Sequence, residues 1–406
     1  MNNILLISIS EPSKGGAESI QTARYLKYLS NYFEITLLSS KPEKKGWDKT
    51  DPSILHYGEG IYKKIEFPIY ANVISRIARY KLLPSKIMFP DSSFLFHFLG
   101  IKKLKEIRKN NPDIIYSRST PFSSTILAYK IKKKLKIPWV MHLSDPWAGN
   151  PYRDNQLINK DRIWEKKAFN MADLITLTSE NAVAYYHLRY PELSSKILYF
   201  PNVFDPQNNY ENDLQNLDKL KIIYSGNLYG ERNLEPFLLA LDFIERNNPE
   251  LLNSIKFIIA GNIDEFNLSL INKNNRSNWP VTILGPLSND EALKLIRKGH
   301  LLLTIDKPFN TKIDNLFFPS KIMDYIAANR FILGISNSGS PTFQAVHKKY
   351  GICFQHDQIK EIGEFLISMI MEFKNENFSI FRNENEDHFF SAKYQANKLK
   401  SVFEQL

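Results

Sequence analysis

The chain has 406 residues, roughly two to three times the length of an average single domain, so two domains are expected. Hydrophobic residues make up 43% and charged residues 24% of the sequence, which is typical of folded proteins and excludes wholesale disorder. The single cysteine, Cys353, excludes a disulfide framework and any metal centre built from several cysteines. No stretch approaches the ~18 apolar residues that span a bilayer, and residues 1–10 lack the features of a signal peptide. We therefore expect a cytoplasmic protein.

The net charge of +10 is concentrated in one part of the chain. Residues 61–136 contain 17 lysines and arginines but only four acidic residues, whereas the remainder is slightly acidic. A basic region confined to one domain indicates an anionic partner for that domain, such as phosphate groups, a membrane surface or nucleic acid. The alternative is a lysine-rich helix face in solvent, which is the simpler account of residues 132–134.

Strand-like apolar runs alternate with amphipathic stretches of helical length, a pattern that predicts parallel sheets with crossover helices. In the first half, strands are predicted at 4–8, 34–38, 113–117, 139–143, 174–178 and 197–200, with helices at 17–30 and 123–136. In the second half, strands are predicted at 221–224, 256–260, 282–284, 301–305 and 331–334, with helices at 233–246, 289–298 and 320–328.

A polar stretch rich in Asn, Asp and Gln separates the two halves, as a linker would. We therefore predict an N-terminal Rossmann-like domain over 1–204, a linker over 205–218, a C-terminal Rossmann-like domain over 219–385 and a last helix over 386–406. Ligands of such domains bind beyond the carboxyl ends of the strands.

Two motifs of the first half lie at such strand ends. Gly15 and Gly16 precede a helix, where backbone amides favour an anion, although an ordinary tight turn is the alternative. Glu18, in the first helical turn, matches the helix dipole and needs no further role. His142 and Asp145 follow the strand at 139–143. A histidine there hydrogen-bonds hydroxyls or moves a proton near neutral pH, and the aspartate binds a hydroxyl or caps the turn.

Two motifs of the second half suit a nucleoside diphosphate. Gly226, Asn227 and Arg232 follow the strand at 221–224, and two glycines with a basic residue before a helix suit a pyrophosphate. Lys321 and Asp324 are three residues apart and share one helix face, so they can offer a cation to phosphate and a carboxylate to ribose hydroxyls. The alternative is a surface ion pair, worth only about 0.2–0.5 kcal/mol.

The ordered segments GGAES, PDIIYSRSTPFSSTILA, MHLSDPWAG, YSGNLYGERN and FPSKIMDYIAANRFILG resemble the two-domain family 4 glycosyltransferases that build bacterial surface polysaccharides. The resemblance implies a GT-B fold, in which two Rossmann-like domains face each other across a cleft and the C-terminal helix crosses back to the N-terminal domain. It implies a nucleotide-sugar donor in the C-terminal half, an acceptor in the N-terminal half and retention of the anomeric configuration. No cofactor and no catalytic metal are implied, because the nucleotide diphosphate sugar is a substrate.

The resemblance also assigns roles to the phosphate-binding residues. Gly15 and Gly16 match a loop near the donor phosphates. Asn227 stands where many members of the family have a basic residue, so Arg232 and Lys321 are expected to be the two cations that stabilise the diphosphate leaving group.

This sequence has an acidic residue at only one of the two acidic positions of the family's motif. Asp324 matches the acid that contacts ribose, whereas Leu316 stands at the first acidic position of that motif, and Asp314 is a candidate substitute. His142 and Asp145 are expected to position hydroxyl groups for transfer.

We therefore predict a retaining glycosyltransferase that moves a sugar from a nucleotide diphosphate donor to a glycan or polyprenyl-linked acceptor in capsule or lipopolysaccharide O-antigen synthesis. A nucleotide-sugar epimerase of the same fold and a non-catalytic partner of a glycosyltransferase complex are the alternatives. Nucleic acid is not expected as a partner, because the basic residues are confined to one domain.

Residues 68–86 and the phenylalanines that follow them combine basic, aliphatic and aromatic side chains. This mixture is typical of an interfacial segment that binds anionic lipid. We expect peripheral binding at the inner face of the cell membrane. The alternative is an ordinary helix that lines the cleft and packs its apolar face in the core.

Overall fold

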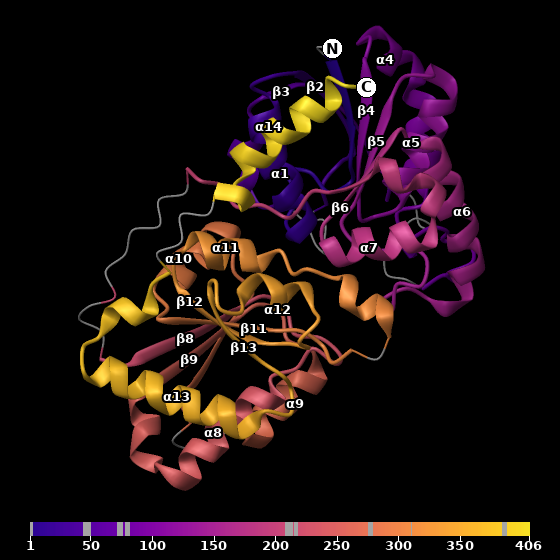
Figure 1. Ribbon diagram of the computed structural model, residues 1–406. Coiled ribbons are helices and arrows are strands. Elements are labelled where there is room, and N and C mark those ends of the chain that lie inside the picture. Colours follow the sequence, from indigo (N-terminus) through magenta and orange to yellow (C-terminus); the bar gives the residue numbers. More distant parts are fainter. Residues whose placement is uncertain are drawn as a thin grey trace. The chain divides into compact units, whose positions relative to one another are not determined.

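The computed structural model describes residues 3–43, 50–70, 76–77, 82–207, 214, 218–274, 279–309, 311–383 and 388–406. These residues form two compact units, each built on one parallel sheet (Figure 1). Unit 1 comprises Met1–Asp205, Thr311–Phe317 and His388–Leu406, and unit 2 comprises Pro206–Asn310 and Phe318–Asp387. The predicted fold class, two α/β domains with parallel sheets, is confirmed.

Unit 1 contains a seven-stranded sheet with the order β3-β2-β1-β4-β5-β6-β7. Its strands are β1 Asn3–Ile7, β2 Glu34–Ser40, β3 Ile61–Phe67, β4 Ile114–Ser119, β5 Trp139–Leu143, β6 Leu174–Leu177 and β7 Ile197–Tyr199. Strand β3 is missing from the sequence-based prediction, because two adjacent lysines and a glutamate interrupt its apolar residues and leave no continuous apolar run.

Helices cover both faces of this sheet. They are α1 Ala17–Leu29, α3 Leu95–Gly100, α4 Leu104–Lys109, α5 Ser123–Leu135, α6 Ile158–Met171, α7 Glu180–Arg189 and α14 Ala392–Phe403, with 3-10 helices at Pro52–Gly58, Ile101–Lys103, Asn155–Leu157, Pro191–Lys196, Lys312–Leu316 and His388–Phe390. Because successive side chains of a strand point to opposite faces, Ile4 and Leu6 pack with α1 and α14, whereas Leu5 and Ile7 pack with the side that carries α3 to α7.

The last helix, α14, is an integral part of unit 1. Figure 1 shows it beside α1, and the two helices pack together. The ring of Phe403 lies 5.9 Å from the ring of Phe33 and 5.4 Å from that of Tyr116. Its side chain is fully buried, so this helix closes the hydrophobic core on one face of the sheet.

Unit 2 contains a six-stranded sheet with the order β10-β9-β8-β11-β12-β13. Its strands are β8 Leu220–Ser225, β9 Ile255–Ala260, β10 Val281–Gly285, β11 Leu301–Ile305, β12 Phe331–Ile335 and β13 Gly351–Phe354. Its helices are α8 Glu235–Asn247, α9 Glu265–Asn274, α10 Asn289–Arg297, α11 Lys321–Ala327, α12 Pro341–Val346 and α13 Ile359–Lys374, with 3-10 helices at Pro249–Ser254 and Phe378–Phe381. The edge strand β13 is also missing from the prediction, because its four residues are too few to form a clear pattern.

One short segment differs from the predicted organisation. Residues Thr311–Phe317 are predicted within the C-terminal domain, but they group with unit 1. Ser179 Oγ donates to the carbonyl of Leu316 at 2.7 Å, and Asn181 Nδ2 donates to the carbonyl of Asn315 at 3.0 Å. The Leu316 side chain is buried in the hydrophobic core of unit 1.

Parts of two predicted segments lie outside the described residues. They are 208–213 and 215–217 of the linker, and 71–75 and 78–81 of the interfacial segment. Leu214 is described, and its side chain is buried in the core of unit 2. Within the described ranges, no helix is long and apolar enough to cross a membrane.

The packing of α14 predicts a large stability loss for Phe403→Ala. Removal of this buried ring leaves a cavity, so the free energy of unfolding should fall by about 3–5 kcal/mol. Chemical denaturation of the full chain measures this change. Tyr394→Ala on the same helix is the matched control, because the Tyr394 side chain is 50% exposed. Equal denaturation midpoints for the two variants would show that α14 does not contribute to the core.

Candidate functional site

The carboxyl ends of β8 and β9 approach each other so closely that glycine follows both strands. Gly226 N donates to the carbonyl of Ala260 at 2.8 Å, and a Cβ on Gly261 would overlap the carbonyl oxygen of Gly226. Gly230 N donates to Asp264 Oδ2 at 2.7 Å. Both glycines of the SGNLYG motif therefore use their amides inside the protein and not for phosphate. Gly226 allows the close approach to Gly261, whereas Gly230 has open space around it and a φ of 57°.

Lys321 lies at the first position of α11 and faces this glycine turn. A Cβ on Gly226 would lie 3.6 Å from Lys321 Nζ, and Nζ itself lies 3.7 Å from the ring centroid of Tyr224. The ammonium is buried and has no hydrogen-bond partner among the described residues. Burial holds the pKa of Lys321 well below its usual value, the nearby positive charge of Arg232 lowers it further, and the carboxylate of Asp306 opposes the shift. Burial of N–H groups without hydrogen-bond partners is costly, so this ammonium is a candidate contact for an anion.

The other predicted donor residues of unit 2 have different surroundings. Arg232 is half-buried, and its Nη1 donates to Tyr229 Oη at 3.4 Å. The Asn227 Oδ1 accepts from the backbone N and the Nδ2 of Asn262 at 3.0 and 3.2 Å, so this side chain joins the loops after β8 and β9. Asp324 is half-buried on α11, one turn after the lysine. The structure thus brings the two predicted cations together and gives Asn227 a structural contact.

Two residues of this site were missed in the sequence. Tyr325 Oη accepts from Ser225 N at 2.8 Å and donates to the carbonyl of Leu303 at 3.2 Å, which fixes α11 against the ends of β8 and β11. Asp306 directly follows β11, and its Oδ2 accepts from Ser336 Oγ at 2.7 Å. An acidic residue immediately after a buried strand was the signal available for Asp306.

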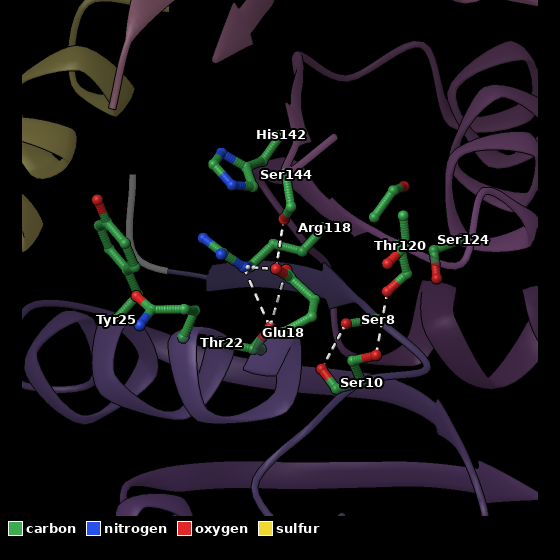
Figure 2. Close-up of polar contacts among 12 residues, drawn as sticks. Ser8, Ser10, Glu18, Thr22, Tyr25, Arg118, Thr120, Ser124, His142 and Ser144 are labelled. Atoms are coloured by element: carbon green, nitrogen blue, oxygen red, sulfur yellow. Dashed lines mark hydrogen bonds and ion pairs between the residues drawn. The ribbon is translucent and has the colours of Figure 1, made fainter. Parts of the chain in front are cut away.

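Unit 1 carries a second polar cluster at the carboxyl ends of β4 and β5 (Figure 2). Arg118 Nε donates to Glu18 Oε1 at 3.0 Å, and Ser144 Oγ donates to Glu18 Oε2. His142 Nδ1 lies 2.9 Å from Thr176 Oγ1. Burial, assisted by the positive charge of Arg118, holds the pKa of His142 well below its usual value. The imidazole is therefore neutral at pH 7 and takes up a proton poorly, which favours hydrogen bonding to hydroxyls over proton transfer.

Buried carboxylates of α6 hold the loop that carries Asp145. Asp161 accepts from Trp147 Nε1 at 2.9 Å, and Glu165 accepts from Ala148 N at 2.8 Å. Burial raises the pKa of Glu165. Asp145 itself is half-buried. Because the two carboxylates hold the loop, the backbone at Asp145 is fixed.

The loop before α1 is fixed by an inward-pointing lysine. Lys14 Nζ donates to the carbonyl of Ile9 at 2.7 Å and to Ser40 Oγ at 2.8 Å. Gly16, with a φ of 106°, caps α1 and is exposed, whereas Gly15 is half-buried. This conformation explains the need for glycine at 16 without a ligand, and the predicted donor contact of both glycines stays a prediction.

Residues 63–208 match the family model Glycosyltransferase Family 4. Solved structures of the same fold cover the whole chain. HepE from Anabaena, in complex with UDP and glucose, shares 13% sequence identity over 100% of both chains with a TM-score of 0.67. The lipopolysaccharide outer core galactosyltransferase WaaB in its apo form shares 14% over 100% of both chains with a TM-score of 0.58. A putative UDP-N-acetylglucosamine 2-epimerase from Listeria monocytogenes shares 13% over 100% of this chain and 97% of its own, also with a TM-score of 0.58.

None of the curated proteins matches the chain in sequence. Residues 63–208 nevertheless form a glycosyltransferase family 4 domain, and the chain as a whole has the GT-B fold. The predicted family and enzyme class are confirmed.

The buried ammonium predicts that Lys321→Met stabilises the free protein. Because the pKa of Lys321 is lower in the folded than in the unfolded chain, the unfolded chain binds the proton more readily. This lysine therefore costs stability at neutral pH, and the penalty shrinks as the pH rises toward about 10. The methionine variant should gain roughly 1–3 kcal/mol at pH 7.

Thermal unfolding of both proteins between neutral pH and about pH 10 measures this effect. The difference in stability between the variant and the wild type should decrease as the pH rises. Lys294→Met on α10 is the control, because that lysine is exposed. A Lys321→Met protein that melts below the wild type at pH 7 would contradict an uncompensated buried charge.

Proposed function

We propose that this glycosyltransferase transfers a sugar from a nucleoside diphosphate donor, bound by unit 2, to a glycan or polyprenyl-linked acceptor in the synthesis of a bacterial surface polysaccharide such as capsule or O-antigen. The observation that carries the proposal is the buried ammonium of Lys321 beside Arg232, at the carboxyl edge of the sheet. In this proposal a diphosphate supplies negative charge to both cations, and in the free protein the carboxylate of Asp306 acts on Lys321. Uridine is the favoured base, since the structure of HepE contains UDP and glucose.

In this proposal the transfer proceeds with retention and needs no protein nucleophile. Negative charge grows on the leaving diphosphate, and Lys321 and Arg232 stabilise it electrostatically. An oxygen of the leaving phosphate accepts the proton of the attacking hydroxyl, so His142, whose pKa is held low by burial, is not needed as a base and can bind a neighbouring hydroxyl of the acceptor. Asp324 binds the ribose hydroxyls. Metal ions have no part in the proposal, because the two side chains supply the positive charge.

An epimerase is the second candidate, since a putative UDP-N-acetylglucosamine 2-epimerase shares the fold. The match of residues 63–208 to a glycosyltransferase family favours transfer. The two activities differ in a product that is simple to detect. An epimerase changes the configuration of the donor sugar without an acceptor, whereas a transferase consumes the donor and releases the nucleoside diphosphate.

A membrane-bound acceptor is supported by the surface of unit 1. The basic surface predicted over 61–136 continues onto α6, where the acidic residues Asp161 and Glu165 are buried. Exposed basic side chains of this face are Lys102, Lys105, Arg108, Lys109, Lys133, Lys134, Lys160, Arg162, Lys166 and Lys167. Exposed apolar side chains accompany them at Leu82, Ile87 and Ile163, and Lys160 Nζ donates to the carbonyl of Lys86 at 3.3 Å. We infer peripheral binding of this face to anionic lipid, at the inner face of the cell membrane.

The donor proposal predicts the behaviour of Arg232→Ala and Lys321→Ala. A thermal-shift screen of nucleoside diphosphate sugars identifies the donor, because bound ligand raises the melting temperature. On that donor, each variant should lose about 10²–10³ in turnover, since each removes a charge that stabilises the leaving group. Lys294→Ala should keep wild-type turnover. Near-wild-type rates in both site variants would show that these residues do not contact the diphosphate.

The membrane proposal predicts co-sedimentation with vesicles that contain anionic lipid. Binding should fall as salt rises, because salt screens the attraction between exposed charges. Arg162→Glu combined with Lys166→Glu on α6 should weaken binding at least about tenfold. Lys393→Glu combined with Lys398→Glu is the control, because these exposed lysines lie on α14 at the other face of the sheet. Equal binding of the two double variants would exclude α6 as the lipid-binding face.

A further inference from the structure

Arg118 is a buried cation of unit 1 that the proposed donor chemistry does not use. Its Nε donates to Glu18 Oε1 and also to Thr22 Oγ1 at 3.1 Å, and its Nη1 donates to Tyr116 Oη at 2.9 Å. Its carbon Cζ lies 5.0 Å from the ring centroid of Tyr25. These contacts fix the plane of the guanidinium. The Nη2 atom, however, is buried and has no hydrogen-bond partner in the described part of the chain.

His142 has a second unused polar atom on the same face of the sheet. Arg118 of β4 and His142 of β5 are register partners, so their side chains project side by side from neighbouring strands. Figure 2 shows both side chains above α1, with Ser144 beside His142 and Arg118 in direct contact with Glu18. His142 Nε2 is buried and, among the described residues, makes no hydrogen bond. Two adjacent buried groups without partners are unusual in a folded protein, since each unsatisfied group costs about 1–3 kcal/mol.

The charges of this cluster indicate which kind of group satisfies both atoms. The carboxylate of Glu18 already compensates the guanidinium of Arg118, and the imidazole of His142 is neutral. An additional anion would lie beside Glu18 without a second cation, which is unfavourable in a buried site. A hydroxyl group carries no charge, and it both accepts and donates a hydrogen bond.

We propose that Arg118 Nη2 and His142 Nε2 together bind one hydroxyl of a neutral acceptor sugar. Arg118 Nη2 donates to the hydroxyl oxygen, and the hydroxyl donates to His142 Nε2. The proposal assigns the proton to His142 Nδ1, which then donates to Thr176 Oγ1 at 2.9 Å and leaves Nε2 as the acceptor. The inference rests on the proposed transferase function and names the acceptor class that unit 1 recognises. Arg118 is then a specificity-determining residue, and Glu18 positions it.

Nuclear magnetic resonance of the full chain with labelled histidine rings tests this pocket. The His142 ring signals are assigned by comparison with His142→Gln, and their 15N shifts report which ring nitrogen carries the proton. The probes are the methyl glycosides of glucose, galactose and N-acetylglucosamine, each added with and without UDP. We expect Nδ1 to be protonated, and the Nε2 signal to move when at least one of these glycosides binds.

Arg118→Met combined with Glu18→Gln removes both members of the ion pair and leaves no unpaired buried charge. This double variant should bind the glycoside about 10- to 100-fold more weakly, because it loses a hydrogen bond from a charged donor. Its affinity for UDP should stay the same. The matched control is Lys103→Met combined with Glu106→Gln, which removes an exposed ion pair of the same unit.

Three results would overturn the inference. The first is a wild-type chain that binds UDP while no glycoside moves the His142 signal. The second is a signal that moves at lower concentration with methyl glucuronide or inorganic phosphate than with the neutral glycosides, which would make the pocket an anion site. The third is a double variant that folds and binds the glycoside as tightly as the control. A wild-type chain that binds no nucleotide would instead contradict the proposed transferase function. The glycoside titration would then still show whether Arg118 and His142 bind a sugar hydroxyl.

Discussion

The constraint on which both candidate sites depend is the burial of a positive charge that the protein itself does not fully satisfy. Lys321 in unit 2 has no hydrogen-bond partner for its ammonium among the described residues, and Arg118 in unit 1 leaves one guanidinium nitrogen unused there. Burial of an uncompensated charge costs several kcal/mol, so the surrounding core must provide that stability. The fold does so with two parallel sheets whose central strands are buried on both faces. Each candidate site thus keeps at least one buried polar atom for which a ligand can supply the missing partner.

The charges around the two buried cations differ, and so do the ligand groups that we propose for them. In unit 2, the positive charge of Arg232 and the carboxylate of Asp306 both act on the buried Lys321, for which we propose a diphosphate as ligand. In unit 1, Glu18 compensates Arg118 and the neutral imidazole of His142 adds no charge, which matches a hydroxyl. In our two proposals, a buried cation at the carboxyl edge of a parallel sheet binds an anion in one unit and a hydroxyl in the other.

Sequence patterns predicted the central strands of both sheets well, because strands buried on both faces are continuous apolar runs. The strands β5 and β11 were predicted with their observed bounds, whereas the edge strands β3 and β13 were missed. Lys321, Arg232 and His142 could be proposed from their places after strands or before a helix. Arg118 could not, because its importance arises from an atom that remains unpaired only after β4, β5 and α1 have packed together. The sequence predicts where polar residues gather, and packing decides which of their atoms stay available.

Leu316 is a second residue whose role could be understood only from the packing. The resemblance places an acid at this position, and the sequence alone left open whether its loss alters activity. The side chain is buried in the core of unit 1, and its carbonyl accepts from Ser179 Oγ. An acid there would be buried beside apolar side chains, so the position favours leucine for packing. Nor is Asp314 simply free to replace the acid, because its Oδ2 accepts from Thr311 N at 2.8 Å and caps the turn. Because this segment is used for packing, our proposal assigns the electrostatic contribution of unit 2 to the positive charges of Arg232 and Lys321.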